Sequence, residues 1–73
     1  MAKQKWEYCI LTAHETAEKS QYILAYAHRV EKPDVKTETR LTIMERLGQE
    51  GWELVAVHPL ATGLKELYFK RAK

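Results

Sequence analysis

The chain has 73 residues, 45% of them hydrophobic, and its 12 Lys and Arg against 10 Asp and Glu give a formal net charge of +2. This length predicts a single domain, residues 1–73, whose core is too small to be strongly stable on its own. Because the two charge signs are interspersed and form no basic stripe, we do not expect a nucleic-acid partner.

The cysteine and histidine content excludes two common ways of stabilising so small a domain. Cys9 is the one cysteine, so no intrachain disulfide forms, and His14, His28 and His58 are too scattered for a zinc site. We therefore predict no metal and no cofactor, and homo-oligomerisation, to a dimer or higher, remains as the support. No apolar stretch is long enough for a signal peptide or a membrane span, which predicts a cytoplasmic protein without a membrane partner.

Two strands are predicted in the N-terminal part of the chain. Lys5 to Ala13 carries large apolar side chains on both parities, and Gln21 to Val30 alternates with a period of two. The polar segment His14–Ser20 predicts a connecting loop, so that the two strands pair as a hairpin. A helix over Gln21–Val30 stays open as an alternative, because Tyr22 and Tyr26 are one helical turn apart.

A helix is predicted after the break at Lys32-Pro33-Asp34, from Val35 or Lys36 to Glu50, with Asp34 as its N-cap. Gly48 indicates either a close approach of the helix to the sheet or fraying of the last turn. The helix stops at Gly51, where the chain needs a residue that tolerates a positive φ. Its apolar face, widened by Ile43, comprises Thr37, Leu41, Met44, Leu47 and Gly48.

The rest of the chain predicts two more strands. Trp52 to His58 alternates and ends at Pro59, Leu60 to Gly63 forms a turn, and Leu64 to Arg71 alternates again. The predicted fold is therefore α+β, a four-stranded and mainly antiparallel sheet with one helix on one face, in the order ββαββ.

One helix covers only one face of such a sheet, so the other face needs a different cover. Alternation along the strands divides the side chains into two sets, although sequence does not fix the parity between strands. The set assigned to the helix side is Cys9, Leu11, Ala13, Ile23, Ala25, Ala27, Val55, Val57, Leu67 and Phe69. The set assigned to the opposite side is Trp6, Tyr8, Ile10, Tyr22, Leu24, Tyr26, Trp52, Leu54, His58 and Tyr68.

The opposite set is aromatic and apolar, which is typical of an interface. We predict a non-enzymatic, oligomeric interaction or ligand-binding module whose interface comprises Trp6, Tyr8, Tyr22, Leu24, Tyr26, Trp52, Leu54 and Tyr68. An aromatic platform for stacked bases is an alternative use of that face. A further alternative is a bacterial or phage protein that sequesters a nucleotide or another small anion, at a site formed by Tyr8, Tyr22, Tyr26, Arg29, Arg40 and Arg71.

No residue is predicted to be catalytic. A small enzyme would need His28 and His58 to meet on the sheet, or Glu7 and Glu53 to form a carboxylate pair. Burial is expected to suppress the thiolate of Cys9. Glu7 and Glu53 are instead predicted to form ion pairs with Lys5, Lys70 or Arg71, or to be solvated.

Three stretches together resemble a known family: Lys5-Trp6-Glu7-Tyr8, Leu47-Gly48-Gln49-Glu50-Gly51-Trp52-Glu53-Leu54-Val55 and Tyr68-Phe69-Lys70-Arg71. They are similar to the small bacterial and phage proteins grouped as domain of unknown function family 4177, and they cover both ends of the chain and the junction between helix and strand. The resemblance implies a compact α+β domain and assigns no activity. The chain departs from that family between His14 and Lys36, where relatives have a shorter connection, so a function particular to this protein is expected there.

Overall fold

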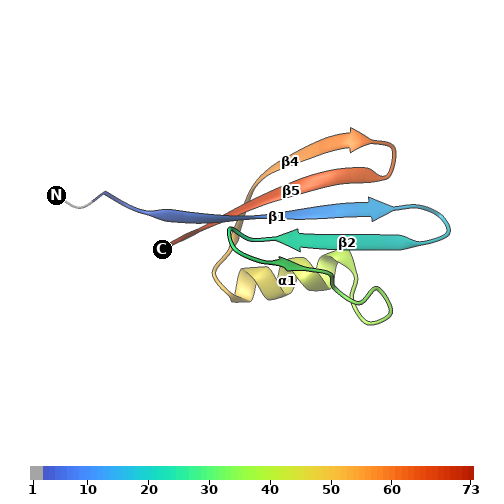
Figure 1. Cartoon of the computed structure of the whole chain (residues 1–73), viewed down its shortest axis with the longest axis horizontal. Helices are drawn as coiled ribbons and strands as arrows, with labels where there is room; N and C mark the ends of the chain where they lie inside the picture. Colours follow the sequence, from blue (N-terminus) through green and yellow to red (C-terminus); the bar gives the residue numbers. More distant parts are fainter. Residues whose placement is uncertain (1–2) are drawn as a thin grey trace.

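The computed structural model describes residues 3–73 as one antiparallel sheet with a single helix. The strand order is β3-β2-β1-β5-β4, so β1 lies at the centre (Figure 1). The α+β content is as predicted, but four strands in the order ββαββ is wrong, because β3 adds a fifth strand before the helix. The elements are β1 (Trp6–Glu15), β2 (Ser20–Ala25), β3 (Val30–Glu31), α1 (Arg40–Gln49), β4 (Glu53–Ala61) and β5 (Leu64–Ala72).

β1 and β2 form the predicted hairpin, and the alternative of a helix in this segment is wrong. The connecting turn closes with a hydrogen bond of 2.9 Å from the Thr16 N–H to the Lys19 carbonyl oxygen. Both strands extend into the segment predicted as loop, so that Glu15 lies opposite Ser20. A turn of only four residues therefore fixes the register of the whole hairpin.

β2 ends at Ala25, where the chain reverses and adds the short edge strand β3. The Tyr26 N–H donates to the Arg29 carbonyl oxygen at 2.8 Å, and Val30 then pairs with Ala25. The alternation that begins at Gln21 continues through the turn residues. The sequence pattern therefore conceals the reversal and predicts one strand in place of two.

α1 begins later than predicted, at Arg40, and its N-cap is Thr39 instead of Asp34. The Thr39 hydroxyl accepts a hydrogen bond from the Thr42 N–H at 3.2 Å, and the Thr42 hydroxyl accepts one from the Thr39 N–H at 2.9 Å. These reciprocal bonds form a capping box. Asp34 accepts the Lys36 N–H at 2.9 Å and stabilises a separate turn before the helix.

The helix ends at Gln49 with Glu50 as its C-cap, and Gly51 follows with the predicted positive φ, 91°. The Gly51 N–H donates to the Gly48 carbonyl oxygen at 3.0 Å, and the Trp52 N–H donates to the Leu47 carbonyl oxygen at 2.9 Å, which is a Schellman motif. Trp52 and Leu47 belong to the same buried cluster. Nothing lies within 4 Å of the position that a Cβ would take at Gly48, so the predicted close approach of the helix to the sheet is wrong.

β4 continues through Pro59 to Ala61, so the prediction that it ends at Pro59 is wrong. β4 is an edge strand, and an edge strand tolerates proline because its outer N–H groups have no partner strand. The pairing with β5 is irregular between Leu54 and Ala56 and again between Pro59 and Ala61, as at β-bulges. β5 follows a tight turn in which Gly63 has a φ of 75°.

The core lies between α1 and one face of the sheet, and it confirms the predicted faces of β1 and β5. Ile43 and Leu47 of the helix are completely buried there. The two faces of β2 are exchanged relative to the prediction. The hairpin register places Leu24 opposite Leu11, and residues directly opposite each other lie on the same face of the sheet. The sheet side of the core comprises Cys9, Leu11, Ala13, Tyr22, Leu24, Trp52, Leu67 and Phe69.

Trp52 and Leu54 also lie on the helix side, contrary to the prediction. Trp52 precedes β4, and the Schellman motif places it next to the helix, where it is 6% exposed. Leu54 lies opposite Phe69 and Val57 opposite Leu67, although Leu54 and Val57 differ in parity. The bulge between them shifts the alternation by one residue and brings both to the same face.

Candidate functional site

The face of the sheet away from α1 is uncovered, and we call it the open sheet face. Tyr8 and Val30 on this face are 59% and 62% exposed. The Lys70 ammonium lies 4.2 Å from the centroid of the Trp6 ring, a cation–π contact at its rim. The large apolar side chains that the strand register places on this face are Trp6, Tyr8, Ile10, Ile23, Val30 and Tyr68.

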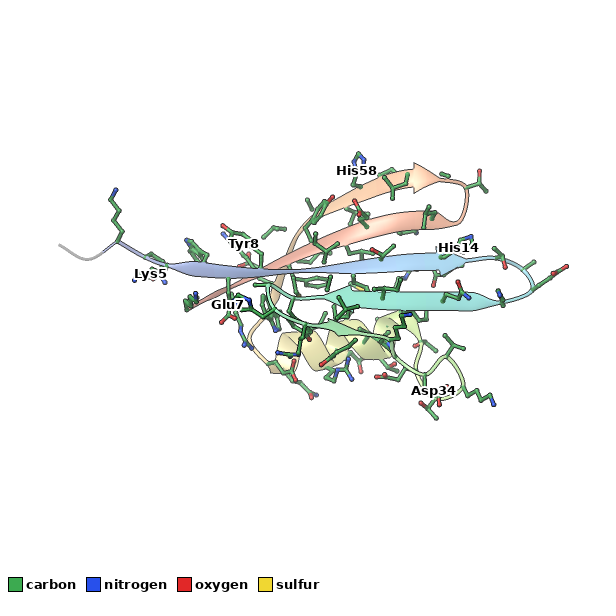
Figure 2. All side chains as sticks on the ribbon, in the orientation of Figure 1. Lys5, Glu7, Tyr8, His14, Asp34 and His58 are labelled. Atoms are coloured by element: carbon green, nitrogen blue, oxygen red, sulfur yellow. The ribbon has the colours of Figure 1, made fainter. Side chains whose placement is uncertain are left out.

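The predicted interface residues separate into two groups. Trp6, Tyr8 and Tyr68 lie on the open sheet face, and Figure 2 shows Tyr8 projecting from β1. Tyr26 occupies the turn after β2 and packs against the core. The remaining members lie on the helix side and do not belong to the open sheet face: Tyr22, Leu24 and Trp52, which are buried, and Leu54, which is 40% exposed. Ile23 and Val30 take their place, and only the register of β2 could identify them.

Three of the predicted ligand residues form a stack with Trp52 at the C-terminal end of α1. The Tyr26 and Trp52 rings lie 5.9 Å apart between centroids and are tilted by 54°. The guanidinium of Arg29 lies 3.9 Å from the centroid of the Tyr26 ring, and that of Arg71 lies 4.4 Å from the centroid of the Trp52 ring. Burial raises the pKa of Tyr26, so its hydroxyl is neutral at physiological pH.

Both arginines of this stack are already paired with carboxylates. Arg29 Nε lies 3.2 Å from a carboxylate oxygen of Glu31, and this hydrogen bond raises the pKa of Arg29. Arg71 Nε lies 3.0 Å from Glu7, which confirms the predicted ion pair, and Arg71 Nη1 donates to the Glu50 carbonyl oxygen at 2.8 Å. The stack therefore has the features of a structural contact between sheet and helix end, with its charges balanced.

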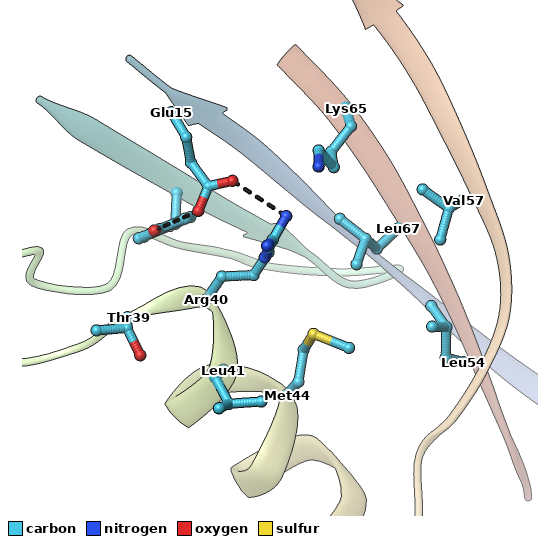
Figure 3. Close-up of a pocket in the computed structure, with 10 residues that line it drawn as sticks. Glu15, Thr39, Arg40, Leu41, Met44, Leu54, Val57, Lys65 and Leu67 are labelled. Atoms are coloured by element: carbon cyan, nitrogen blue, oxygen red, sulfur yellow. Dashed lines mark hydrogen bonds and ion pairs between the residues drawn. The ribbon is translucent and has the colours of Figure 1, made fainter. Parts of the chain in front are cut away.

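Tyr22 and Arg40, two more of the predicted ligand residues, meet at the carboxylate of Glu15. The Tyr22 hydroxyl donates to Glu15 Oε2 at 2.9 Å, and Arg40 Nη1 lies 3.1 Å from Oε1. The Lys65 side chain lies beside them (Figure 3). Tyr8, the last of the six, is on the open sheet face, so the predicted ligand residues do not form one site.

These polar groups form one end of a groove of about 660 Å³ between α1 and β4, which we call the α1–β4 groove. Sequence reasoning missed Glu15 and Lys65, because they come together through the pairing of Ala13 with Lys65 across β1 and β5. The apolar lining of the groove comprises Leu41, Met44, Leu54, Val57 and Leu67.

The residue pairs that an enzyme would need do not come together. His28 lies in the turn after β2 and His58 lies on β4, toward opposite edges of the sheet. Glu7 lies opposite Arg71 on the helix side, whereas Glu53 lies opposite Lys70 on the open side. Within residues 3–73, no three or more His, Cys, Asp or Glu form a group suited to a metal ion. The same part of the chain contains no helix with the length and apolar character to cross a membrane.

Cys9 is buried under the helix, with 1% of its surface exposed. Burial raises the pKa of its thiol from 9.0 to about 11, and Arg71 offsets this only in part. Below the lower pKa the thiol is neutral in both the folded and the unfolded chain. Above it the unfolded chain ionises first, so Cys9 lowers stability as the pH rises from 9.0 to about 11.

We expect Cys9 to react with iodoacetamide at least about a hundredfold more slowly in the folded chain than in urea, because the two pKa values differ by about two units. The measurement is the rate of carbamidomethylation by mass spectrometry at about pH 8, a pH below both pKa values. A free cysteine peptide in the same buffers controls for the effect of urea on the reagent. Equal rates in the two states would contradict the burial of this thiol.

No family model matches the chain, and neither a curated protein nor a solved structure matches it. The resemblance to domain of unknown function family 4177 therefore stays a prediction from its three sequence stretches.

Proposed function

We propose that the chain is a non-enzymatic interaction module that forms homo-oligomers through the open sheet face. The observation that supports this proposal is the apolar centre of that face, where Ile10 lies between Ala25 and Tyr68. No element among residues 3–73 covers these side chains, because the single helix packs on the other side. Two sheets that pack face to face would remove this surface from water.

The edges of the sheet support association through the face in preference to strand addition. β3 has only two residues, and β4 combines Pro59 with two irregular pairings. Short edge strands, proline and bulges are the features that keep sheets from joining edge to edge. A second copy therefore finds few free backbone groups in register at either edge.

Replacing Ile23 by lysine is expected to dissociate the oligomer. Ile23 is 40% exposed on the open sheet face, so a lysine there is tolerated by the monomer but would be buried without a partner in the assembly. Ala17→Lys is the control for the added charge, because Ala17 is exposed in the turn between β1 and β2.

Size-exclusion chromatography with light scattering measures the effect. We expect the wild type and Ala17→Lys to have a mass of at least twice 8.5 kDa and Ile23→Lys to have a mass of 8.5 kDa. A wild-type protein that stays monomeric as its concentration rises into the high micromolar range would remove the basis of the proposal.

The alternative function, sequestration of a small anion, has one observation in its favour. Arg40 and Lys65 line the same end of the α1–β4 groove, where Glu15 balances only one of their two charges. The stack that contains Arg29 and Arg71 gives this alternative no support, since both arginines are paired.

A further inference from the structure

We propose that the α1–β4 groove binds a single-chain fatty acid, with the acyl tail between α1 and β4 and the carboxylate between Arg40 and Lys65. This site is separate from the open sheet face, so the proposal does not depend on self-association. It rests on the apolar walls of the groove and on the excess of positive charge at one end. It also rests on the position of α1, which leaves the side chains on the helix side of β4 exposed.

The apolar walls arise because α1 packs over the central strands and does not extend over the edge strand. Ile43 and Leu47 direct the helix onto the core, whereas Leu41, two residues before Ile43 and so on a different side of the helix, is 65% exposed. Leu54 and Val57 on the helix side of β4 are 40% and 51% exposed (Figure 3). One wall of the groove is α1 and the other is β4. A single extended acyl tail between them would remove the apolar side chains of both walls from water.

The charged end of the groove determines the sign of the ligand. The guanidinium of Arg40 offers five N–H donors, and its recorded ion pair with Glu15 at 3.1 Å involves one nitrogen. Lys65 forms no ion pair within 4 Å with the residues that the structure describes. Two cations and one carboxylate leave an excess of one positive charge, which matches the single charge of a carboxylate.

Isothermal titration below the micelle concentration tests the ligand class with three probes. We expect decanoate to bind with one molecule per chain. Hexanoate is expected to bind at least about tenfold more weakly, because it lacks four methylene groups that the walls would bury. Decyltrimethylammonium has the same tail with the opposite charge and is expected to bind at least about tenfold more weakly. Equal binding of the two decyl probes would overturn the proposal, and so would the absence of heat from millimolar decanoate at both about 15 °C and about 35 °C, since burial of the tail makes the enthalpy of binding change with temperature.

Charge variants test the position of the carboxylate. Lys65→Gln is expected to weaken decanoate binding by about three- to tenfold, because it removes a cation from the head site. Glu15→Gln is expected to strengthen binding, since it removes the competing carboxylate and keeps an acceptor for Tyr22. Lys5→Gln makes the same charge change on an exposed residue outside the groove and is expected to have no effect. Equal effects of Lys65→Gln and Lys5→Gln would contradict a specific head site.

The methyl group of Met44 reports the position of the tail, since Met44 lines the groove and is one of only two methionines in the chain. We expect decanoate to shift the ¹³C-methyl resonance of Met44 in the wild type and equally in Ile23→Lys, whatever the oligomeric state of either. Decanoate binding that leaves this resonance unchanged would place the ligand elsewhere. A groove covered by a second copy is the competing outcome. It would appear as dissociation of the oligomer by Leu41→Gln together with no decanoate binding by the wild type.

Discussion

Trp52→Ala is expected to lower the free energy of unfolding by roughly 3–5 kcal/mol, the range for deletion of a buried aromatic side chain. Trp52 is 6% exposed and joins the core on the helix side. Its ring also contacts the ring of Tyr26 and the guanidinium of Arg71, and both contacts disappear in the variant. A loss of this size is comparable with the whole stability of a small domain, so the variant is expected to be largely unfolded at room temperature.

Trp6→Ala is the matched control, because it deletes the same side chain from the open sheet face. Trp6 is 42% exposed in the single chain and loses mainly the cation–π contact with Lys70, so we expect a loss below about 1 kcal/mol when the variants are compared in the Ile23→Lys background, where the proposed oligomer does not form. Far-ultraviolet circular dichroism reports the unfolding of Trp52→Ala without urea, and urea denaturation followed by the same signal measures Trp6→Ala and Trp52→Phe without relying on tryptophan fluorescence. Trp52→Phe keeps a ring in the core and should fold, with a smaller loss. A larger loss for Trp6→Ala than for Trp52→Ala would reverse the assignment of the two faces.

Gly63→Ala is expected to destabilise the protein by about 2–4 kcal/mol, for two reasons that act together. Gly63 has a φ of 75°, a conformation that a residue with a Cβ adopts only with strain. An added Cβ would also overlap the backbone carbonyl oxygen of Glu15, which belongs to the end of the central strand. The same pair of residues forms a hydrogen bond of 2.7 Å from the Glu15 N–H to the Gly63 carbonyl oxygen, so neither backbone can move freely.

The other two glycines are graded controls for this effect. Gly51 has a φ of 91° with nothing within 4 Å of an added Cβ, so Gly51→Ala is expected to cost about 1 kcal/mol from backbone strain alone. Gly48 lies within the helix with open space beside it, so Gly48→Ala is expected to stabilise the fold by up to about 1 kcal/mol. Thermal denaturation should therefore rank the melting temperatures Gly48→Ala, wild type, Gly51→Ala, Gly63→Ala. Equal effects of the last two would show that the overlap with Glu15 is relieved at no cost.

Local features of this chain could be predicted because their causes are local. The helix end at Gly51 follows from glycine before an alternating segment, and the structure confirms it with a Schellman motif. The N-cap was missed because Asp34 competes with Thr39, and the capping box with Thr42 decides between them. The strand β3 was missed because alternation continues unbroken through a tight turn.

The candidate site could be predicted only in part, because it depends on how strands pair. Tyr8 and Tyr68 are on the open sheet face as expected, since β1 and β5 pair with residues of equal parity opposite each other. Tyr22 and Leu24 are buried, because a hairpin turn of four residues places them opposite odd-numbered residues of β1. A change of one residue in that turn would exchange the two faces of β2.

By itself, the sequence determined the α+β content, the positive-φ glycine after the helix at Gly51 and the alternation of β1, β2 and β5, because these depend on composition and on neighbours along the chain. Only the tertiary structure decided which of the two alternating sets of side chains on each strand faces α1. It also decided which residues far apart in the sequence come into contact. Glu15, Arg40 and Lys65 come together through a hairpin register, a helix start and a cross-strand pair. The hairpin register and the cross-strand pair are set by long-range pairing, which no local pattern records.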